Sequence, residues 1–257
     1  MNLGLAGKTV MVAGASRGLG FAIAQCLQDE GANVSLSSSN AKAIAAAGEA
    51  LPGSHAQACD VRNADDITDW VAQTVSRFGG IDALVVNAGG PPPGGFSDFD
   101  DADWQAAFEL TLLSAVRLVR AALPALTERQ GNILFMTSSS VKEPIDFLLL
   151  SNVMRSGVAS LAKSLSRSLA ADGLRVNCIV PGIVETDRIK ALVANQAKAK
   201  AIKAEDQRAQ MEAQVPMGRF GRPDEFARTA TFLLSPAASY INGETVTVDG
   251  GTMKTLF

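Results

Sequence analysis

The sequence contains a glycine-rich turn, Gly14-Ala-Ser-Arg-Gly-Leu-Gly20, between two segments of different character. The run 8–13 is short, apolar and β-branched, which is typical of a buried strand, and 21–27 has the pattern of a helix. Glycine lets the backbone turn tightly and approach a ligand, and the following helix offers free N–H groups and a positive dipole end to phosphate. Many strand–helix joints need glycine for steric reasons alone. The turn by itself therefore does not distinguish a phosphate-binding site from a tight structural turn.

Strand-like and helix-like segments alternate along the whole chain. The expected strands are 8–13, 33–37, 55–60, 81–87, 132–137, 175–180 and 245–249, and the expected helices are 21–27, 41–51, 64–78, 101–126, 150–171 and 224–234. This alternation predicts a parallel sheet covered by helices on both faces. We expect one α/β domain over residues 1–257, with a doubly wound parallel sheet of about seven strands that binds ligands at the carboxyl ends of its strands.

The stretch 189–214 departs from this alternation. It is rich in Ala, Lys, Glu and Gln, which gives it high helix propensity but a thin apolar face. Because it follows the end of a strand, we expect a helical, lid-like insertion near residues 187–215. A solvated surface helix is the alternative.

Composition excludes several classes of protein. A hydrophobic content of 47% with 19% charged residues is typical of a globular chain, and a net charge of −3 without a basic cluster argues against a nucleic-acid partner. The apolar runs are shorter than the ~20 residues of a membrane helix, and the first residues lack the apolar core of a signal peptide. We therefore expect a cytoplasmic protein with no membrane partner.

The cysteines, Cys26, Cys59 and Cys178, are isolated in the sequence, and the chain has one histidine. No Cys/His spacing suitable for a metal exists, so we expect no metal site and three buried, reduced thiols.

Several separated motifs stand in a common order. They are Ala13-Gly14-Ala-Ser-Arg-Gly-Leu-Gly20, Cys59-Asp-Val61, Val86-Asn-Ala-Gly89, Ser138-Ser139, Arg175-Val-Asn177, Pro181-Gly-Ile-Val-Glu-Thr186, Gly218-Arg-Phe-Gly-Arg-Pro223, Ile241-Asn-Gly243 and Val248-Asp-Gly-Gly251. With them, the sequence resembles the short-chain dehydrogenase/reductases over essentially its whole length, particularly the β-ketoacyl-carrier-protein-reductase-like branch. The resemblance implies a single Rossmann domain, a nicotinamide dinucleotide, a small-molecule substrate and a homo-oligomer, either a tetramer or a dimer.

The resemblance also implies which residues hold the dinucleotide. They are Gly14, Ser16, Arg17, Gly18, Leu19 and Gly20 at the pyrophosphate turn; Asp60 and Val61 at the adenine; Asn87, Ala88 and Gly89 at the ribose; Pro181, Gly182 and Ile183 at the nicotinamide; and Thr186 at the carboxamide or phosphate.

The charge at the end of the second strand bears on the choice of dinucleotide. An NAD-preferring site places an acidic residue there to bind the ribose 2′-hydroxyl, but this chain has Ser38 and Ser39. Serine hydroxyls and Arg17 can hold a 2′-phosphate that a carboxylate would repel. We therefore expect NADP(H), with NAD as the alternative.

The catalytic positions depart from the family pattern. The resemblance implies an Asn, a Ser, a Tyr thirteen residues after the Ser and a Lys four residues later, and the corresponding residues here are Thr111, Ser138, Ser151 and Arg155. The single tyrosine, Tyr240, lies just before the last strand and cannot take the missing place. A serine is a far poorer proton donor than a phenol, whereas the arginine can still hold ribose hydroxyls.

The loop after the fifth expected strand contains one residue that could replace the tyrosine as a proton donor. Lys142 follows Ser138 by four residues, and burial can lower a lysine pKa toward neutrality. The alternative is that Lys142 is a solvated loop charge.

Two functions remain open on the sequence. The first is an NADP(H)-dependent oxidoreductase that acts on a carbonyl or alcohol with altered proton delivery. The second is a catalytically silent NADP(H)-binding sensor or subunit. A halohydrin dehalogenase is disfavoured, because those relatives keep the tyrosine and have lost the cofactor turn.

Overall fold

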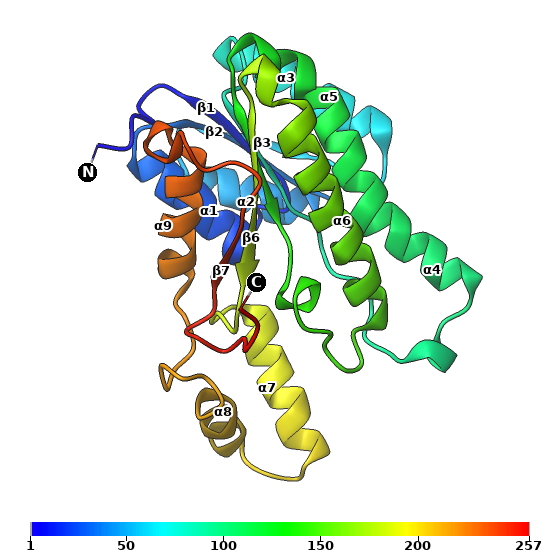
Figure 1. Ribbon diagram of the computed structural model, residues 1–257. Coiled ribbons are helices and arrows are strands. Elements are labelled where there is room, and N and C mark those ends of the chain that lie inside the picture. The colour runs from blue at the N-terminus through cyan, green and yellow to red at the C-terminus, as the bar shows by residue number, and fades with distance from the viewer. Residues whose placement is uncertain (1, 257) are drawn as a thin grey trace.

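In the computed structural model, which describes residues 2–256, one seven-stranded parallel sheet runs through the molecule (Figure 1). Its strand order is β3-β2-β1-β4-β5-β6-β7. The strands are β1 (Thr9–Val12), β2 (Asn33–Ser38), β3 (His55–Ala58), β4 (Ala83–Val86), β5 (Asn132–Met136), β6 (Arg175–Pro181) and β7 (Thr245–Val248). The predicted fold class is confirmed, and the strand bounds differ from the expected ones by one or two residues.

Helices cover both faces of the sheet. They are α1 (Gly18–Asp29), α2 (Ala41–Ala50), α3 (Ala64–Phe78), α4 (Asp101–Ala107), α5 (Ser114–Glu128), α6 (Leu149–Ser168), α7 (Asp187–Ala199), α8 (Ala204–Glu212) and α9 (Pro223–Leu234). One core, with Ile23 and Phe226, joins α1, α2 and α9 to the sheet, and the other, with Trp70, Leu118 and Val158, joins α3, α5 and α6 to it. Both central strands, β1 and β4, are therefore buried throughout, which explains their continuous apolar sequences.

The strand order reverses at the centre of the sheet. The chain builds β1, β2 and β3 outward on one side and then returns to place β4 beside β1 on the other. The helices that follow β1 and β4 therefore diverge, and in open α/β sheets the ligand crevice lies at the carboxyl ends of the strands at such a point.

The expected long helix 101–126 is wrong in one respect, because it is interrupted. Between α4 and α5 the chain forms a π-helical segment, Phe108–Leu113, in which Thr111 is buried. A π turn adds a residue to the helical repeat, and such turns are frequent at functional sites.

The same helical run shows that the expectation of only short apolar segments, too short for a membrane helix, is wrong. Residues Asp101–Glu128 are long and apolar enough to span a bilayer by length and hydropathy. One face of the run nevertheless packs into the protein core through Ala115, Leu118 and Ala122. We therefore assign it as a core helix of the α/β domain.

The insertion after β6 forms two helices, α7 and α8, which project beyond the carboxyl ends of the strands (Figure 1). Val193 and Met211 pack with Phe220 and give the pair a small apolar core of its own. Arg208 of α8 donates hydrogen bonds to Glu185 at 2.7 Å and to Glu212 at 2.9 Å. The insertion is thus tied to the segment that leaves β6.

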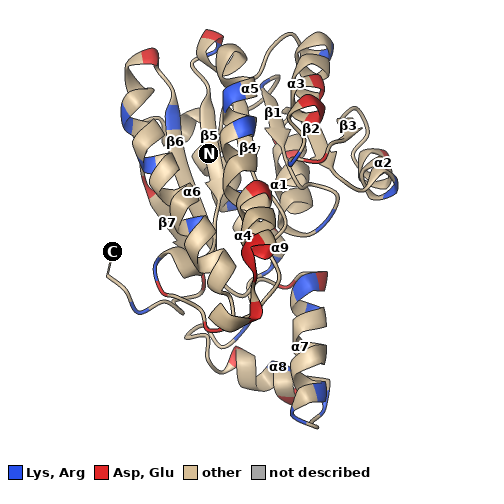
Figure 2. Cartoon of the chain, turned by 90° about the vertical axis from the view of Figure 1, so that its right-hand side faces the viewer, with Lys and Arg blue, Asp and Glu red and all other residues tan. Residues whose placement is uncertain are grey.

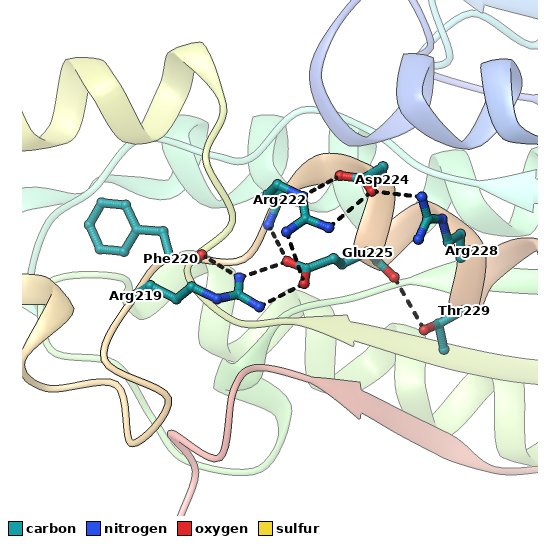
Figure 3. Close-up of polar contacts among 7 residues, drawn as sticks. All are labelled: Arg219, Phe220, Arg222, Asp224, Glu225, Arg228 and Thr229. Atoms are coloured by element: carbon teal, nitrogen blue, oxygen red, sulfur yellow. Dashed lines mark hydrogen bonds and ion pairs between the residues drawn. The ribbon is translucent and has the colours of Figure 1, made fainter.

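The motif 218–223 fastens the chain after α8 to the same segment. Arg219 binds both carboxylate oxygens of Glu225 at 2.7 and 2.8 Å, and the backbone N–H of Arg222 donates to that carboxylate (Figure 3). These contacts lower the pKa of Glu225 to about 2. Gly221 donates its N–H to the carbonyl of Ile183 at 2.9 Å. The motif is therefore bonded to residues 182–186, the strap that joins β6 to α7.

The cysteines follow the expectation only in part. Cys59 and Cys178 are buried, and burial raises the pKa of each thiol to about 12, but Cys26 is only half-buried. Within residues 2–256, no three or more His, Cys, Asp or Glu side chains gather where they could hold a metal.

Candidate functional site

The glycine turn lies at the crevice, between the end of β1 and the beginning of α1. Gly14 and Gly18 have φ angles of 60° and 61°, a region that favours glycine. A Cβ atom on Gly20 would lie 2.4 Å from the carbonyl oxygen of Gly14, so only glycine allows the helix to begin this close to the strand. No side chain caps the first turn of α1 at Arg17, and its N–H groups are therefore available to an anion.

Asn87 braces this turn from the end of β4. Its side-chain amide donates to the carbonyl of Ala13 at 3.1 Å and to that of Gly14 at 3.2 Å. The resemblance implies contact with the ribose through 87–89, and the structure adds that Asn87 also fixes the shape of the glycine turn. Gly14 cannot carry a side chain, because its Cβ would lie 2.7 Å from the Asn87 amide nitrogen.

Hydroxyl groups gather at the end of β2. The Ser16 hydroxyl donates to Ser38 at 3.1 Å, and Ser39 and Arg17 are exposed beside them. The glycine turn and the end of β2 thus offer hydroxyl and guanidinium donors at the same edge of the sheet. This set of donors suits a phosphate ester better than a pair of ribose hydroxyls.

Asp60 is engaged within the protein. Arg62 donates through Nε and Nη2 to the Asp60 carboxylate, with an Nη2–Oδ2 distance of 2.6 Å, and this contact lowers the pKa of Asp60. The carboxylate lies just after β3, beside the buried Val61. No pattern in the sequence predicts the contact between Asp60 and Arg62.

The strap after β6 closes the opposite side of the crevice. Gly182 donates to the carbonyl of Val248 at 2.9 Å, and a Cβ atom on it would lie 2.5 Å from Asp249. Thr186 caps α7 by accepting from the N–H of Ile189 at 3.4 Å. Its methyl group lies 3.8 Å from the Cβ position of Gly18. The strap, which begins after Pro181 and includes Ile183, therefore reaches across to the glycine turn.

The catalytic candidates lie on β5 and α6. Ser138 follows β5, and its hydroxyl accepts from the N–H of Ser140 at 3.2 Å. Ser151 and Arg155 are one turn apart on α6, which places them on the same helix face. Ser151 is 8% exposed.

Arg155 points toward the end of β5. Its Nη1 atom donates to the carbonyls of Met136 and Thr137 at 3.2 and 3.4 Å. Burial, together with the positive charge of Arg188, lowers the pKa of Arg155 to about 10. At neutral pH it is therefore still a cation, with donors left over for a ligand.

Thr111 and Arg155 line a common pocket of about 10 Å³, which Asn87 also lines. This volume is that of one water molecule. Thr111 is 4% exposed, and its hydroxyl is without a hydrogen-bond partner among the described residues. The π-helical segment thus places a hydroxyl without a partner in the same small pocket as the arginine.

Two further side chains, Lys142 and the single histidine, His55, lie on different parts of the fold. Lys142 is half-exposed on the loop after β5. His55 lies on β3 and contacts the Ser35 hydroxyl, which also accepts from Trp70 at 2.8 Å. Burial lowers the pKa of His55, and its network is part of the core between β2 and α3.

Arg188 is a site residue that the sequence reasoning missed. It lies in the first turn of α7, where both signs of charge occur (Figure 2). Its Nη atoms lie 3.0 and 3.1 Å from the position that a Cβ on Gly90 would take. The available signal was a cation two residues beyond Thr186, at the beginning of the insertion expected near residues 187–215.

The fold and this site define a dinucleotide-binding α/β protein of the reductase type. Residues 14–253 match the family model described as enoyl-(acyl carrier protein) reductase. The chain is 35% identical to the 3-oxoacyl-[acyl-carrier-protein] reductase FabG of Vibrio cholerae over 253 residues, which cover 97% of this chain and 98% of that one. It therefore belongs to the short-chain dehydrogenase/reductase family, whose members are NAD(P)-dependent oxidoreductases acting on carbonyl or alcohol substrates.

Two solved structures are similar over nearly the whole chain. L-sorbose reductase from Gluconobacter frateurii, in complex with NADPH and L-sorbose, superposes with a TM-score of 0.95, at 31% identity and full coverage of both chains. A short-chain oxidoreductase from Pseudomonas aeruginosa PAO1, described as containing an atypical catalytic center, superposes with a TM-score of 0.89. It is 29% identical, with 98% of this chain and 99% of that one covered.

Proposed function

We propose that this protein is an NADP(H)-dependent oxidoreductase that reduces a carbonyl, or oxidises the corresponding alcohol, without the tyrosine usual in its family. The observation that carries the proposal is the braced glycine turn beside the hydroxyls of Ser16 and Ser38. The turn presents free helix N–H groups to a diphosphate, and the hydroxyls with Arg17 suit a 2′-phosphate.

In this proposal, the dinucleotide lies along the crevice at the carboxyl ends of β1 and β4. Contacts with the diphosphate come from the turn 14–20, contacts with the adenine from 60–61, and contacts with the ribose from 87–89. Residues 181–183 and Thr186 bind the nicotinamide end. Arg155 donates hydrogen bonds to ribose hydroxyls. When bound, NADPH supplies the hydride for carbonyl reduction.

In this proposal, Ser138 and Arg155 stabilise the reacting oxygen. The Ser138 hydroxyl donates a hydrogen bond to the carbonyl, and the buried charge of Arg155 favours the alkoxide that forms. The proton reaches the alkoxide from water or from Lys142, with Ser151 and Thr111 holding water near Arg155. One hydride and one proton per carbonyl complete the reduction.

The proposal includes the remaining expectations. Residues 1–257 form one catalytic domain, α7 and α8 act as a lid, and the protein is a cytoplasmic homo-oligomer, either a tetramer or a dimer. The alternative function is a silent NADP(H)-binding sensor or subunit, and the observation that favours it is the pair Ser151 and Arg155 where the family has Tyr and Lys.

A negative charge introduced at position 38 should change which dinucleotide the protein prefers. We expect Ser38→Asp to weaken NADPH binding by ~10-fold or more, because a carboxylate would repel the 2′-phosphate at close range. Binding of NADH should be unchanged or tighter. Fluorescence titration of the reduced dinucleotides measures both constants. Ser164→Asp, which adds the same charge on the exposed side of α6, is the control and should change neither. Equal weakening of both cofactors would contradict the assignment.

A further inference from the structure

A pocket of about 210 Å³ lies between α7, α8 and the segment that leads into α9. It is lined from α7 by Ile189 and Val193, from the beginning of α8 by Ala204, and from the segment before α9 by Phe220. The two helices project beyond the carboxyl ends of the strands (Figure 1). Within residues 2–256, the lining includes none of the residues that we assign to the dinucleotide or to the reacting carbonyl. The pocket is therefore a second candidate site, separate from the crevice.

The inner wall of the pocket is apolar. Val193 and Phe220 are 7% and 4% exposed. Met211 and the half-buried Ile189 pack with them. The guanidinium of Arg208 lies 5.0 Å from the centroid of the Phe220 ring, a contact that helps to hold this ring in place. Apolar side chains at the base of a pocket favour an apolar ligand, because binding removes both apolar surfaces from water.

The charged residues of the pocket are exposed and balance one another. Lys190 and Glu205 are exposed, and the side chains of Arg208 and Glu185 are 40% and 37% exposed. Arg208 already binds two carboxylates, those of Glu185 at 2.7 Å and Glu212 at 2.9 Å. The lining thus carries two cations and two carboxylates, each in contact with solvent. Because exposed charges contribute little to binding, we expect the pocket to favour a ligand without net charge.

We propose that this pocket binds a neutral, apolar small molecule of about the size of one six-membered ring. A cavity of about 150 Å³ lined by apolar side chains holds benzene, so this larger pocket has room for a ring with a short substituent. The ring would lie against Val193 and Phe220, and a hydroxyl on it would lie among the exposed charged groups. The ligand would contact α7 and α8 together. This site is independent of the proposed function, because the pocket and the crevice are lined by different residues.

Binding can be followed at single residues and without turnover. The probes are phenol, benzyl alcohol and cyclohexanol, titrated into the full-length protein with isotope-labelled isoleucine and valine methyl groups. We expect the methyl resonances of Ile189 and Val193 to shift, with a dissociation constant of ~1 mM or tighter for at least one probe. Those of Ile133 and Val158, in the core beside the sheet, should not move. The charged analogues benzoate and benzylammonium should bind no more tightly than benzyl alcohol.

Variants test the position of the ligand. Ala204→Phe adds a ring to the pocket from an exposed position and should weaken binding of the best probe by ~10-fold or more, because that ring takes the place of the ligand. Ala209→Phe, which adds the same ring at another exposed position of α8, should stay within about twofold of the native affinity. Lys190→Gln and Glu205→Gln should also stay within about twofold, because exposed charges contribute little. The unfolding temperature of each variant shows whether it is folded.

Absence of any shift at Ile189 and Val193 with all three neutral probes at ~10 mM would overturn the proposal. Undiminished binding in Ala204→Phe, or an equal loss in Ala209→Phe, would also overturn it, because the ligand would then lie elsewhere. A charged analogue that binds ~10-fold more tightly than benzyl alcohol, or a loss of that size in either charge variant, would contradict the neutral class of ligand. The titrations contain no dinucleotide, so a failure of the proposed function leaves each of these outcomes decisive for the pocket.

Discussion

Gly20→Ala should weaken NADPH binding by ~10- to 100-fold, because overpacking of this kind costs about 1–3 kcal/mol. The added Cβ would lie 2.4 Å from the carbonyl oxygen of Gly14, which is backbone and is itself fixed by the Asn87 amide. The turn must therefore open and move the N–H groups of α1 away from the diphosphate. Fluorescence titration with NADPH measures the loss, and the unfolding temperature reports the cost to the fold.

Gly95→Ala is the matched control for this substitution. Gly95 lies in the loop after β4 with a φ of −91°, and a Cβ on it would meet only Asp98 at 3.6 Å, which is an ordinary contact. Its NADPH affinity should stay within twofold of the native value. Native affinity in Gly20→Ala would show that the dinucleotide does not use this turn.

The second large effect is a gain. We expect Ser151→Tyr combined with Arg155→Lys and Thr111→Asn to raise the rate of NADPH-dependent carbonyl reduction by ~10²- to 10⁴-fold, the usual contribution of a positioned acid–base group. The phenol would supply the proton that a serine hydroxyl does not. The measurement is NADPH oxidation with a panel of acyl thioesters, quinones, ketones and oxo acids.

The control keeps two of the three changes and moves the phenol. Ser160→Tyr, with Arg155→Lys and Thr111→Asn, places a tyrosine on the exposed side of α6. It should give no gain. If both triple variants are equally active, the tyrosine position has no special role, and Ser151 does not correspond to the family's proton donor.

Much of the fold could be predicted because periodicity and glycine positions are local properties. The central strands are continuous apolar runs, and Gly14, Gly18 and Gly20 stand where the backbone approaches itself or turns with positive φ. Even the helix after Asn63 could be placed, since this asparagine caps it and Gly79 ends it. In each case the residues that determine the strand, turn or helix lie within one short stretch of the sequence.

What the sequence missed depends on contacts between distant segments. The π-helical segment at Thr111 depends on how α4 and α5 pack beside α6, and no local pattern marks it. The approach of Arg188 to Gly90 joins the strap after β6 to the loop after β4, positions almost a hundred residues apart. The contact between Asp60 and Arg62 is local, but it depends on the backbone of the turn after β3, which brings the Arg62 side chain back onto the Asp60 carboxylate.

The most direct test of the account is transfer of deuterium from NADPH labelled at C4 to a carbonyl compound. Each carbonyl of the panel is incubated with the native protein and both C4 epimers of the labelled cofactor, and the alcohol formed is analysed by mass spectrometry. We expect deuterium on the carbinol carbon from one epimer only. Tight NADPH binding with no labelled alcohol from any carbonyl would contradict it and favour a silent dinucleotide-binding protein.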